Sequence, residues 1–458
     1  MPHTLFILFW ATGDLAKRYL FPALSTISAT ENIDIIATGR RTFSESEFHD
    51  FLRVESLEYF SDEHTSSDFF SRLSYQKVDI DQLDAYDALR ERMESLSDRD
   101  TQVVIYLSIA STLFDDFLLG YARLRSRFPH TRIVLEKPFG ADLESARSLH
   151  HSLTPLFPEE QIYRIDHYVA KWWIQNILAL RFANIFFEPI WNHHYIDNIQ
   201  ITVSESLSVG NRGAYYETAG ALRDMVQNHL FQMLALILMR RPDDLTAESI
   251  RQAKTEILKS LSIRNIREDV IFGQYAGYLK EKDVAADSRM ETFVAMRLES
   301  NAPQYEGIPF YLRTGKCLSK KETSIVIEFQ KSQYLGFENA DTPNRIIINI
   351  QSDETIEIHF FTRSPLGEHA LRRTISSTEK IPPSKNAYQK LLEDVIAWDH
   401  TLFISWDMLE ATWELIDALI HCKDDCPIIF PYVALSRGPD AMDALLEADG
   451  RNWYEREK

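Results

Sequence analysis

Two short stretches of this chain contain the residue types that acid–base chemistry needs. Residues 223–229 (RDMVQNH) place His229 beside an amide and five residues after Asp224, in a segment with a helical pattern. Residues 164–168 (RIDHY) supply a second carboxylate–histidine pair, and Lys171 follows closely. A histidine can accept a proton near neutral pH, and a neighbouring carboxylate can orient its ring. Together the two stretches predict a site that binds an anionic, hydroxyl-rich ligand and removes a proton from it.

Each of these histidines also has a less specific interpretation. A single helical histidine is usually a core residue with a satisfied hydrogen bond, and this alternative stands for His229 when it is taken alone. His167 and Lys171 are four residues apart and would share a face if the segment is helical. With Tyr168 they would then present donors suited to a phosphate monoester. The alternative is an exposed cluster that binds no ligand.

The N-terminal region has the pattern of a dinucleotide site. Residues 5–9 form a continuous apolar run, and a Gly-Asp turn and a helical segment follow. The first turn of such a helix offers unpaired N–H groups to a pyrophosphate, and Gly13 allows close backbone approach. The next apolar run ends in Arg40-Arg41 with no acidic residue, which favours the 2′-phosphate of NADP over the free 2′-hydroxyl of NAD. A solvated arginine pair at a strand end is the alternative.

A third candidate position lies at the end of a later apolar strand. Residues 132–136 are followed directly by Lys137 and Pro138. A lysine at the carboxyl end of a parallel strand points toward the crevice in which such sheets bind ligands. A structural ion pair with Glu136 is the alternative interpretation.

The composition restricts the class of partner. The chain has 458 residues and a formal net charge of −19, so we expect no nucleic-acid partner and no binding to an anionic membrane. Three cysteines are too few for a disulfide framework, and Cys422 and Cys426 lack a second ligand pair, so we expect no metal site. The N-terminus lacks the basic region of a signal peptide, and no apolar run is long enough to span a bilayer. We expect a cytoplasmic protein.

The pattern of apolar runs predicts two kinds of architecture. Strand-like runs at residues 5–9, 33–37, 102–107 and 132–136 alternate with helical segments. This alternation predicts an α/β N-terminal doubly wound (Rossmann) domain in residues 1–150. Residues 151–458 contain successive strand patterns with few helices between them, which predicts an α+β C-terminal domain with a large, mainly antiparallel sheet. Its strands are expected at 196–203, 290–298, 323–329, 345–350 and 355–361, and its helices at 171–183, 220–238 and 388–420.

Several runs occur together and in an order that resembles the glucose-6-phosphate dehydrogenase family. The matching runs are 11–18 (ATGDLAKR), 136–140 (EKPFG), 164–168 (RIDHY), 175–184 (QNILALRFAN), 195–198 (YIDN), 220–230 (GALRDMVQNHL), 309–316 (PFYLRTGK) and 349–351 (NIQ). They span nearly the whole chain, and the runs in its middle section are highly specific.

The resemblance implies an enzyme that oxidises D-glucose 6-phosphate at C1 to 6-phospho-D-glucono-1,5-lactone, with NADP as hydride acceptor and NAD as the alternative. This is the first step of the oxidative pentose phosphate pathway. His229 matches the family's general base, and Asp166 matches the carboxylate that orients it. The positions that match substrate contacts are His167, Tyr168 and Lys171 for the phosphate, with Lys137, Glu205, Asp224, Lys316, Lys321 and Gln351. The positions that match the cofactor site are Ala11, Thr12, Gly13, Asp14, Leu15, Lys17, Arg40 and Lys137. The resemblance also implies a homodimer or homotetramer, with dimerisation through the C-terminal domain.

The chain departs from the family pattern mainly on the cofactor side. Trp10 replaces the first glycine of the turn, where a large side chain is expected to crowd the pyrophosphate. Tyr19 replaces a lysine, Ala110-Ser111 replaces Pro-Pro, and residues 169–172 (VAKW) replace Leu-Gly-Lys-Glu. These changes motivate an alternative, a cofactor-impaired, non-catalytic relative that binds sugar phosphate as a regulator or assembly partner. A third alternative is an oxidoreductase of the glucose–fructose oxidoreductase type, against which residues 166–168 and 228–229 argue.

Overall fold

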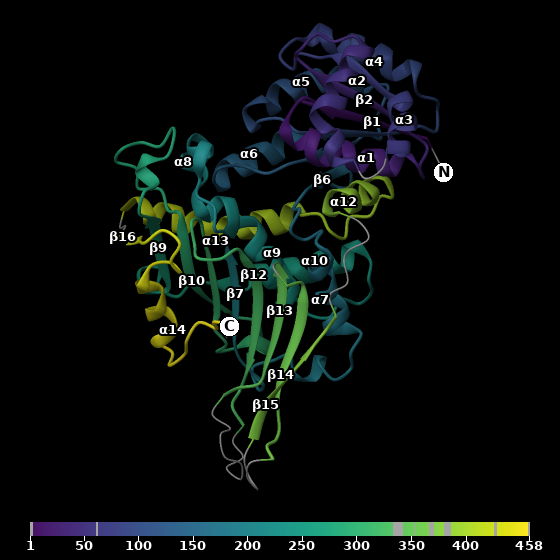
Figure 1. Ribbon diagram of the computed structural model, residues 1–458. Helices are drawn as coiled ribbons and strands as arrows, with labels where there is room; N and C mark the ends of the chain where they lie inside the picture. The colour runs from purple at the N-terminus through teal and green to yellow at the C-terminus, as the bar shows by residue number, and fades with distance from the viewer. Residues whose placement is uncertain are drawn as a thin grey trace. The chain divides into compact units, whose positions relative to one another are not determined.

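The computed structural model describes residues 3–60, 63–332, 342–351, 353–365, 371–379, 386–425 and 428–456. The chain divides into two compact units, each with its own sheet (Figure 1). The first unit comprises Met1–Ala170, Asp244–Arg251 and Pro383–Glu410. The second comprises Lys171–Asp243, Gln252–Pro382 and Ala411–Lys458.

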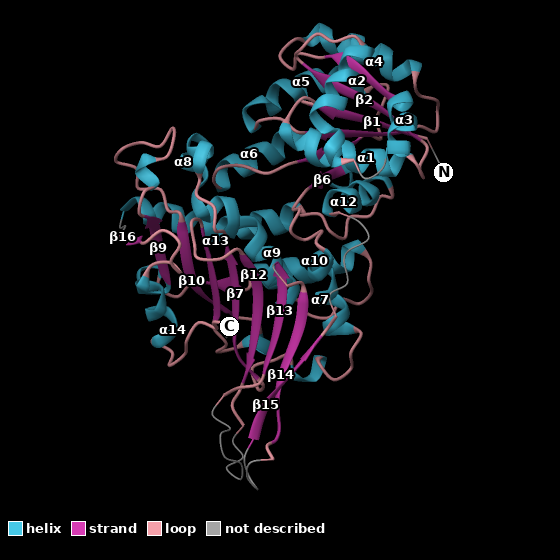
Figure 2. Ribbon diagram, viewed as in Figure 1, coloured by secondary structure: helices cyan, strands magenta, loops and turns pink. Residues whose placement is uncertain are grey.

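The first unit is built on a parallel six-stranded sheet with the order β3-β2-β1-β4-β5-β6. All six residues of β1 are buried, as expected of a strand that helices cover on both faces (Figure 2). The strand order reverses between β1 and β4, and the crevice at such a reversal is where doubly wound sheets bind ligands. The strands are β1 Thr4–Phe9, β2 Ile33–Gly39, β3 Leu73–Lys77, β4 Gln102–Leu107, β5 Arg132–Leu135 and β6 Ile162–Arg164. The helices are η1 Ala16–Leu20, α1 Phe21–Ser28, α2 Glu45–Ser56, α3 Glu63–Arg72, α4 Leu83–Ser95, α5 Phe114–Arg125, α6 Leu143–Leu153 and α12 Ala387–Ile396.

The predicted doubly wound fold is confirmed, and all four predicted strands form. The sequence pattern missed the two edge strands, β3 and β6. β6 has only three residues, and β3 (LSYQK) ends in two polar residues, so neither gives a continuous apolar run.

The second unit is built on a ten-stranded sheet that is mainly antiparallel, as predicted. Its order is β15-β14-β13-β12-β7-β11-β10-β9-β16, with β8 paired to β10. Among the described residues of this unit, only β7 with β11 and β9 with β16 pair in parallel. The strands are β7 Ile196–Ser204, β8 Leu261–Ser262, β9 Val270–Tyr275, β10 Phe293–Ser300, β11 Phe310–Gly315, β12 Glu322–Phe329, β13 Arg345–Gln351, β14 Thr355–Arg363, β15 Leu371–Ser377 and β16 Ile429–Tyr432. The longer helices are α7 Trp172–Phe182, α8 Gly213–Ala221, η7 Leu222–Leu230, α9 Phe231–Leu238, α10 Ala247–Lys259 and α13 Trp406–Asp425.

The prediction of one helix over residues 388–420 is wrong. α12 ends at Ile396 and α13 begins at Trp406. Trp398 lies between them with φ 60°, a left-handed conformation that a continuous helix cannot contain. The helical pattern in the sequence therefore belongs to two helices.

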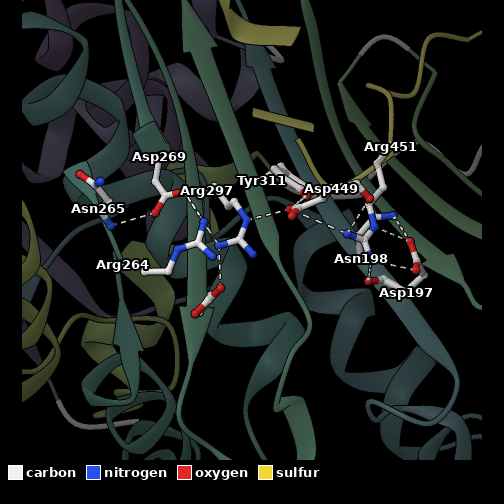
Figure 3. A network of polar contacts seen from close by, with 10 residues as sticks. Asp197, Asn198, Arg264, Asn265, Asp269, Arg297, Tyr311, Asp449 and Arg451 are labelled. Carbon is white, nitrogen blue, oxygen red and sulfur yellow. Dashed lines mark hydrogen bonds and ion pairs between the residues drawn. The ribbon is translucent and has the colours of Figure 1, made fainter. Parts of the chain in front are cut away.

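A network of charged side chains joins the segment that follows α14 (Ala444–Glu447) to the sheet of the second unit (Figure 3). Arg297 on β10 donates to Asp449 over 2.8 Å and to Glu299 over 2.6 Å. Tyr311 on β11 also donates to Asp449. Arg451 donates to Asp197 on β7 over 2.7 Å. The network therefore holds residues 449–451 against three neighbouring strands.

Among the described residues, no helix combines the length and the apolar character needed to cross a membrane. The expectation of no metal at Cys422 and Cys426 concerns Cys426 and the side chain of Cys422, which lie outside the described part of the chain.

Candidate active site

His229 lies near the end of η7, and its side chain is buried. The direction of η7 is set at Gly220, where φ is 59° and a Cβ would lie 2.2 Å from Glu291 Oε1. Glu291 occupies the space that Gly220 leaves, and its Oε1 accepts a hydrogen bond from the backbone N–H of Leu222 over 3.2 Å. The glycine is needed at this position because any side chain would displace Glu291. The motif at residues 220–230 is therefore a kink followed by the helix that carries the histidine.

Glu205, Asp224 and Lys316 form one charged cluster in the second unit. Glu205 follows β7 and Lys316 follows β11, and these strands are parallel neighbours with Ser204 paired to Gly315. The two side chains therefore leave the same edge of the sheet. Lys316 Nζ forms an ion pair with Glu205 and lies 3.4 Å from Asp224 Oδ2. Lys316 and Asp224 are both buried, so this cluster presents fixed charges and hydrogen-bonding groups in a partly dry setting.

Two tyrosines that the sequence analysis missed position this cluster. Tyr215 donates to Asp224 Oδ1 over 3.1 Å, and Tyr432 donates to the backbone oxygen of Lys316 over 2.7 Å. Burial and the neighbouring Asp224 raise the pKa of Tyr215, so its hydroxyl stays protonated and can act as a donor. Tyr215 lies on α8, before the kink at Gly220. Because the helix is interrupted at Gly220, the regular spacing of a helix could not have predicted that Tyr215 contacts Asp224.

Two of the predicted substrate residues have surroundings that differ from those of the charged cluster. Gln351 ends β13 and accepts a hydrogen bond from Thr323 over 3.4 Å. Lys321 is exposed just before β12. Within the described ranges, neither side chain makes a hydrogen bond or an ion pair with Glu205 or Lys316.

Asp166, His167 and Tyr168 lie in the first unit, directly after β6. Asp166 is buried, and its Oδ1 accepts the backbone N–H of Tyr168 over 2.9 Å. The His167 ring stacks on Tyr388 with centroids 6.2 Å apart. Residues 167–170 form turns, and α7 begins only at Trp172, so the helical face expected for His167 and Lys171 does not exist. Lys171 is instead the N-cap residue of α7.

Glu136 and Lys137 follow β5 at the carboxyl edge of the parallel sheet, as predicted. Tyr106, the penultimate residue of the neighbouring strand β4, donates a hydrogen bond to Glu136. Burial raises the pKa of Glu136 to about 7, against the opposing effects of Tyr106 and Lys137. Lys137 therefore lies beside a carboxyl group that is close to half protonated at neutral pH.

The predicted cofactor turn, residues 11–15, connects β1 to the helical segment at the reversal of strand order. The backbone N–H of Ala11 donates to Thr38 on β2 over 2.9 Å, and that of Gly13 donates to Trp10 over 3.0 Å. Lys17 Nζ lies 3.0 Å from Glu55 and 3.5 Å from Asp14. The hydrogen bond from Lys17 to Glu55 is the main cause of its raised pKa. Lys17 is thus already paired with carboxylates.

Trp10 adopts a backbone conformation that glycine normally supplies. Its φ is 62°, in the left-handed region, and its ring lies under the guanidinium of Arg40, with Arg40 Cζ 4.7 Å from the ring centroid. The turn therefore keeps the shape of a glycine turn and tolerates the larger residue. The crowding of a pyrophosphate by Trp10 stays a prediction.

Comparisons with known proteins agree over almost the whole chain. Residues 7–176 match the family model described as glucose-6-phosphate dehydrogenase, NAD binding domain, and residues 178–454 match glucose-6-phosphate dehydrogenase, C-terminal domain. The chain belongs to the glucose-6-phosphate dehydrogenase family. Glucose-6-phosphate 1-dehydrogenases of Chlamydia muridarum and Bacillus subtilis are both 37% identical, covering 99% of this chain and 97% and 98% of those proteins.

Solved structures of family members share the fold described above. A glucose-6-phosphate dehydrogenase in complex with its substrate glucose-6-phosphate has a TM-score of 0.91 at 28% identity, covering 99% of both chains. The Mycobacterium avium glucose-6-phosphate 1-dehydrogenase has a TM-score of 0.90 at 29% identity, covering 100% of this chain and 99% of that one. Membership in this family identifies the chain as an oxidoreductase with a nucleotide-binding domain for a nicotinamide cofactor.

Proposed function

We propose that this protein oxidises D-glucose 6-phosphate at C1 to 6-phospho-D-glucono-1,5-lactone with NADP as the hydride acceptor. The observation that carries the proposal is the match of both family domains along the chain, together with the cluster of Glu205, Lys316 and Asp224. The similarity covers the nucleotide-binding domain as fully as it covers the other domain. It therefore favours the enzyme over a non-catalytic relative.

The chemical roles follow from the residue types and their matches to the family. His229 is the general base and takes the proton from the C1 hydroxyl, and Asp166 orients and stabilises the charged ring. Asp224 and Glu205 accept hydrogen bonds from sugar hydroxyls, and Lys316 forms an ion pair with Glu205 and lies 3.4 Å from Asp224 Oδ2. When bound, the nicotinamide supplies the acceptor for the hydride that leaves C1.

The same proposal assigns the phosphate and the remaining contacts. His167, Tyr168 and Lys171 bind the 6-phosphate, because together they offer a lysine cation, an imidazole N–H and a hydroxyl donor. The other substrate contacts in the proposal are Lys137, Lys321 and Gln351. Residues 1–150 carry the cofactor, and residues 151–458 carry the substrate site and the contact of a homodimer or homotetramer in the cytoplasm.

The residues of the first unit fit a dinucleotide. The turn after β1 lies at the reversal of strand order, and Gly13 presents a backbone without a Cβ. Arg40 is exposed at the end of β2, and no described carboxylate lies within ion-pair distance of it. An arginine without a competing acid suits a 2′-phosphate, so we propose NADP, with NAD as the alternative.

The experiment is the formation of reduced nicotinamide, measured by absorbance with purified protein, glucose 6-phosphate and either NADP or NAD. The expected result is turnover with a higher kcat/KM for NADP than for NAD, and turnover with unphosphorylated glucose should be far slower. The matched control is His229→Asn, which keeps a polar side chain but removes the base. A flat trace for the native protein at high concentration would favour the sugar-phosphate-binding alternative.

A further inference from the structure

The contact between Trp10 and Arg40 is the feature of the cofactor turn that the family pattern does not explain. Arg40 is exposed, and its Cζ lies over the aromatic ring of Trp10, 4.7 Å from the ring centroid. A guanidinium that stacks on an indole is held by cation–π attraction, and its N–H groups point outward in the plane of the group. Arg40 in this position can still donate from its N–H groups to an anion.

The surrounding backbone fixes this contact from both sides. On the Trp10 side, a Cβ on Gly13 would lie 3.3 Å from Trp10 Cδ1 and 3.2 Å from Trp10 O, so the missing side chain of Gly13 makes room for the indole. On the Arg40 side, the hydroxyl of Tyr75 lies 2.6 Å from the backbone oxygen of Arg41 and 3.1 Å from that of Gly39, and its one hydrogen is shared between them. Both partners are thus attached to fixed backbone.

We propose that Trp10 is a specificity-determining residue that holds Arg40 in position to bind the 2′-phosphate on the adenosine half of the cofactor. The inference rests on the proposed function and deepens it. An arginine at an exposed strand end samples many rotamers, and binding a phosphate costs the entropy of choosing one of them. The indole restricts Arg40 in advance, so less of that entropy is lost when the 2′-phosphate binds. An adenosine without this phosphate gains nothing from the restriction.

Binding of two adenosine fragments by isothermal titration calorimetry tests the proposal without requiring turnover. Adenosine 2′,5′-bisphosphate carries the 2′-phosphate, and adenosine 5′-monophosphate lacks it. In Trp10→Gly the affinity for the bisphosphate should fall about two- to fivefold, the effect of losing an exposed cation–π contact, and the affinity for the monophosphate should change little. The variant should fold, because φ of 62° at this position is favourable for glycine.

Trp10→Phe is the matched control because it keeps an aromatic ring at the same backbone position. It should retain the preference for the bisphosphate, whereas Arg40→Ala should lose it. The proposal is overturned if Trp10→Gly binds the bisphosphate equally well or more tightly, or if both fragments weaken by the same factor. A tighter complex would mean that the indole obstructs the adenosine site.

A second measurement uses the native protein and needs no glycine variant. The difference in tryptophan fluorescence between the native protein and Trp10→Phe isolates the signal of Trp10. The bisphosphate should change this signal, and the monophosphate should change it much less; equal changes would contradict a role in phosphate selection. An inactive protein that still shows these fragment preferences would refute the proposed reaction and leave the inference on Trp10 standing.

Discussion

Replacing Asp449 by asparagine should destabilise the second unit, because this carboxylate is shared by a buried arginine and a buried tyrosine. Asp449 Oδ2 accepts hydrogen bonds from Arg297 Nε over 2.8 Å and from the hydroxyl of Tyr311. Arg297 is 8% exposed and Tyr311 is fully buried, so neither can replace the carboxylate with bulk water. Both hydrogen bonds end on Oδ2, so an asparagine oxygen in that place can accept both, but without the negative charge that strengthens them.

The expected loss can be worked out from these contacts. A hydrogen bond to a charged group contributes about 1.5–3 kcal/mol, and one between neutral groups contributes about 0.5–1.5 kcal/mol. Arg297 keeps its bond to Glu299 at 2.6 Å. Loss of the charge should weaken each of the two hydrogen bonds at Oδ2 by about 1 kcal/mol, so we expect a decrease of about 2 kcal/mol in the free energy of unfolding.

Urea denaturation followed by circular dichroism measures this loss, provided that the slope m is unchanged. The matched control is Asp50→Asn, which removes the same charge from an exposed pair with Arg53 at 3.0 Å. This control should change the free energy of unfolding by less than about 1 kcal/mol. The reasoning is refuted if Asp449→Asn is no more destabilising than Asp50→Asn at neutral pH.

The pH dependence gives an independent check on the same residue. Burial alone would raise the pKa of Asp449, but the hydrogen bonds from Tyr311 and Arg297 lower it below its ordinary 3.8. A lowered pKa means that the stabilisation is present above the ordinary pKa and is lost as the pH falls through the folded-state pKa. The penalty of Asp449→Asn should therefore shrink in acid, and a constant penalty would contradict the electrostatic explanation.

Three further variants test the site. Lys316→Gln should raise KM for glucose 6-phosphate by about tenfold or more, since it removes the cation that lies between Glu205 and Asp224; an unchanged KM would remove Lys316 from the substrate site. Glu136→Gln should raise stability relative to the native protein more at pH 8 than at pH 5. Burial raises the pKa of Glu136 to about 7, so the stability that the protonated carboxyl group gives the native protein is lost as the pH rises through that value. At pH 8 the free energy of unfolding of the variant should exceed that of the native protein by up to about 3 kcal/mol. Equal effects of the substitution at both pH values would refute the raised pKa. Gly220→Ala should destabilise by at least about 1–2 kcal/mol and reduce kcat, because its methyl group would overlap Glu291 at φ 59°; a variant of native stability and rate would contradict the kink.

Most of the fold could be predicted because buried strands leave continuous apolar runs. The four central strands of the first sheet have such runs, and five strands of the second have strand-like patterns, several of them alternating. The bounds predicted for these strands agree with the structure to within three residues. β6 has three residues and β3 ends in polar ones, so their strand character comes from pairing with a neighbour. The break between α12 and α13 depends on the backbone of Trp398, which the helical period does not reveal.

Glu205, Asp224 and Lys316 could be named as candidates from the sequence, but their contacts with one another could not be predicted. Glu205 and Lys316 are 111 positions apart and meet because β7 and β11 pair in parallel, and the sequence analysis did not predict β11 as a strand. The link from Tyr215 to Asp224 crosses the kink at Gly220, so no single period connects them. The first contact depends on how two strands far apart in the sequence pair, and the second depends on the kink. The local pattern of apolar and polar residues predicts neither.

The central claim is that the chain removes hydride from C1 of glucose 6-phosphate, and isotope transfer tests it most directly. Glucose 6-phosphate that carries deuterium at C1 should pass the deuterium to the nicotinamide ring of NADP, and mass spectrometry of the reduced cofactor should detect it. The His229→Asn variant should make the same labelled product about 10²- to 10⁴-fold more slowly. Reduced cofactor without deuterium, or no reduced cofactor at high protein concentration, would contradict the account.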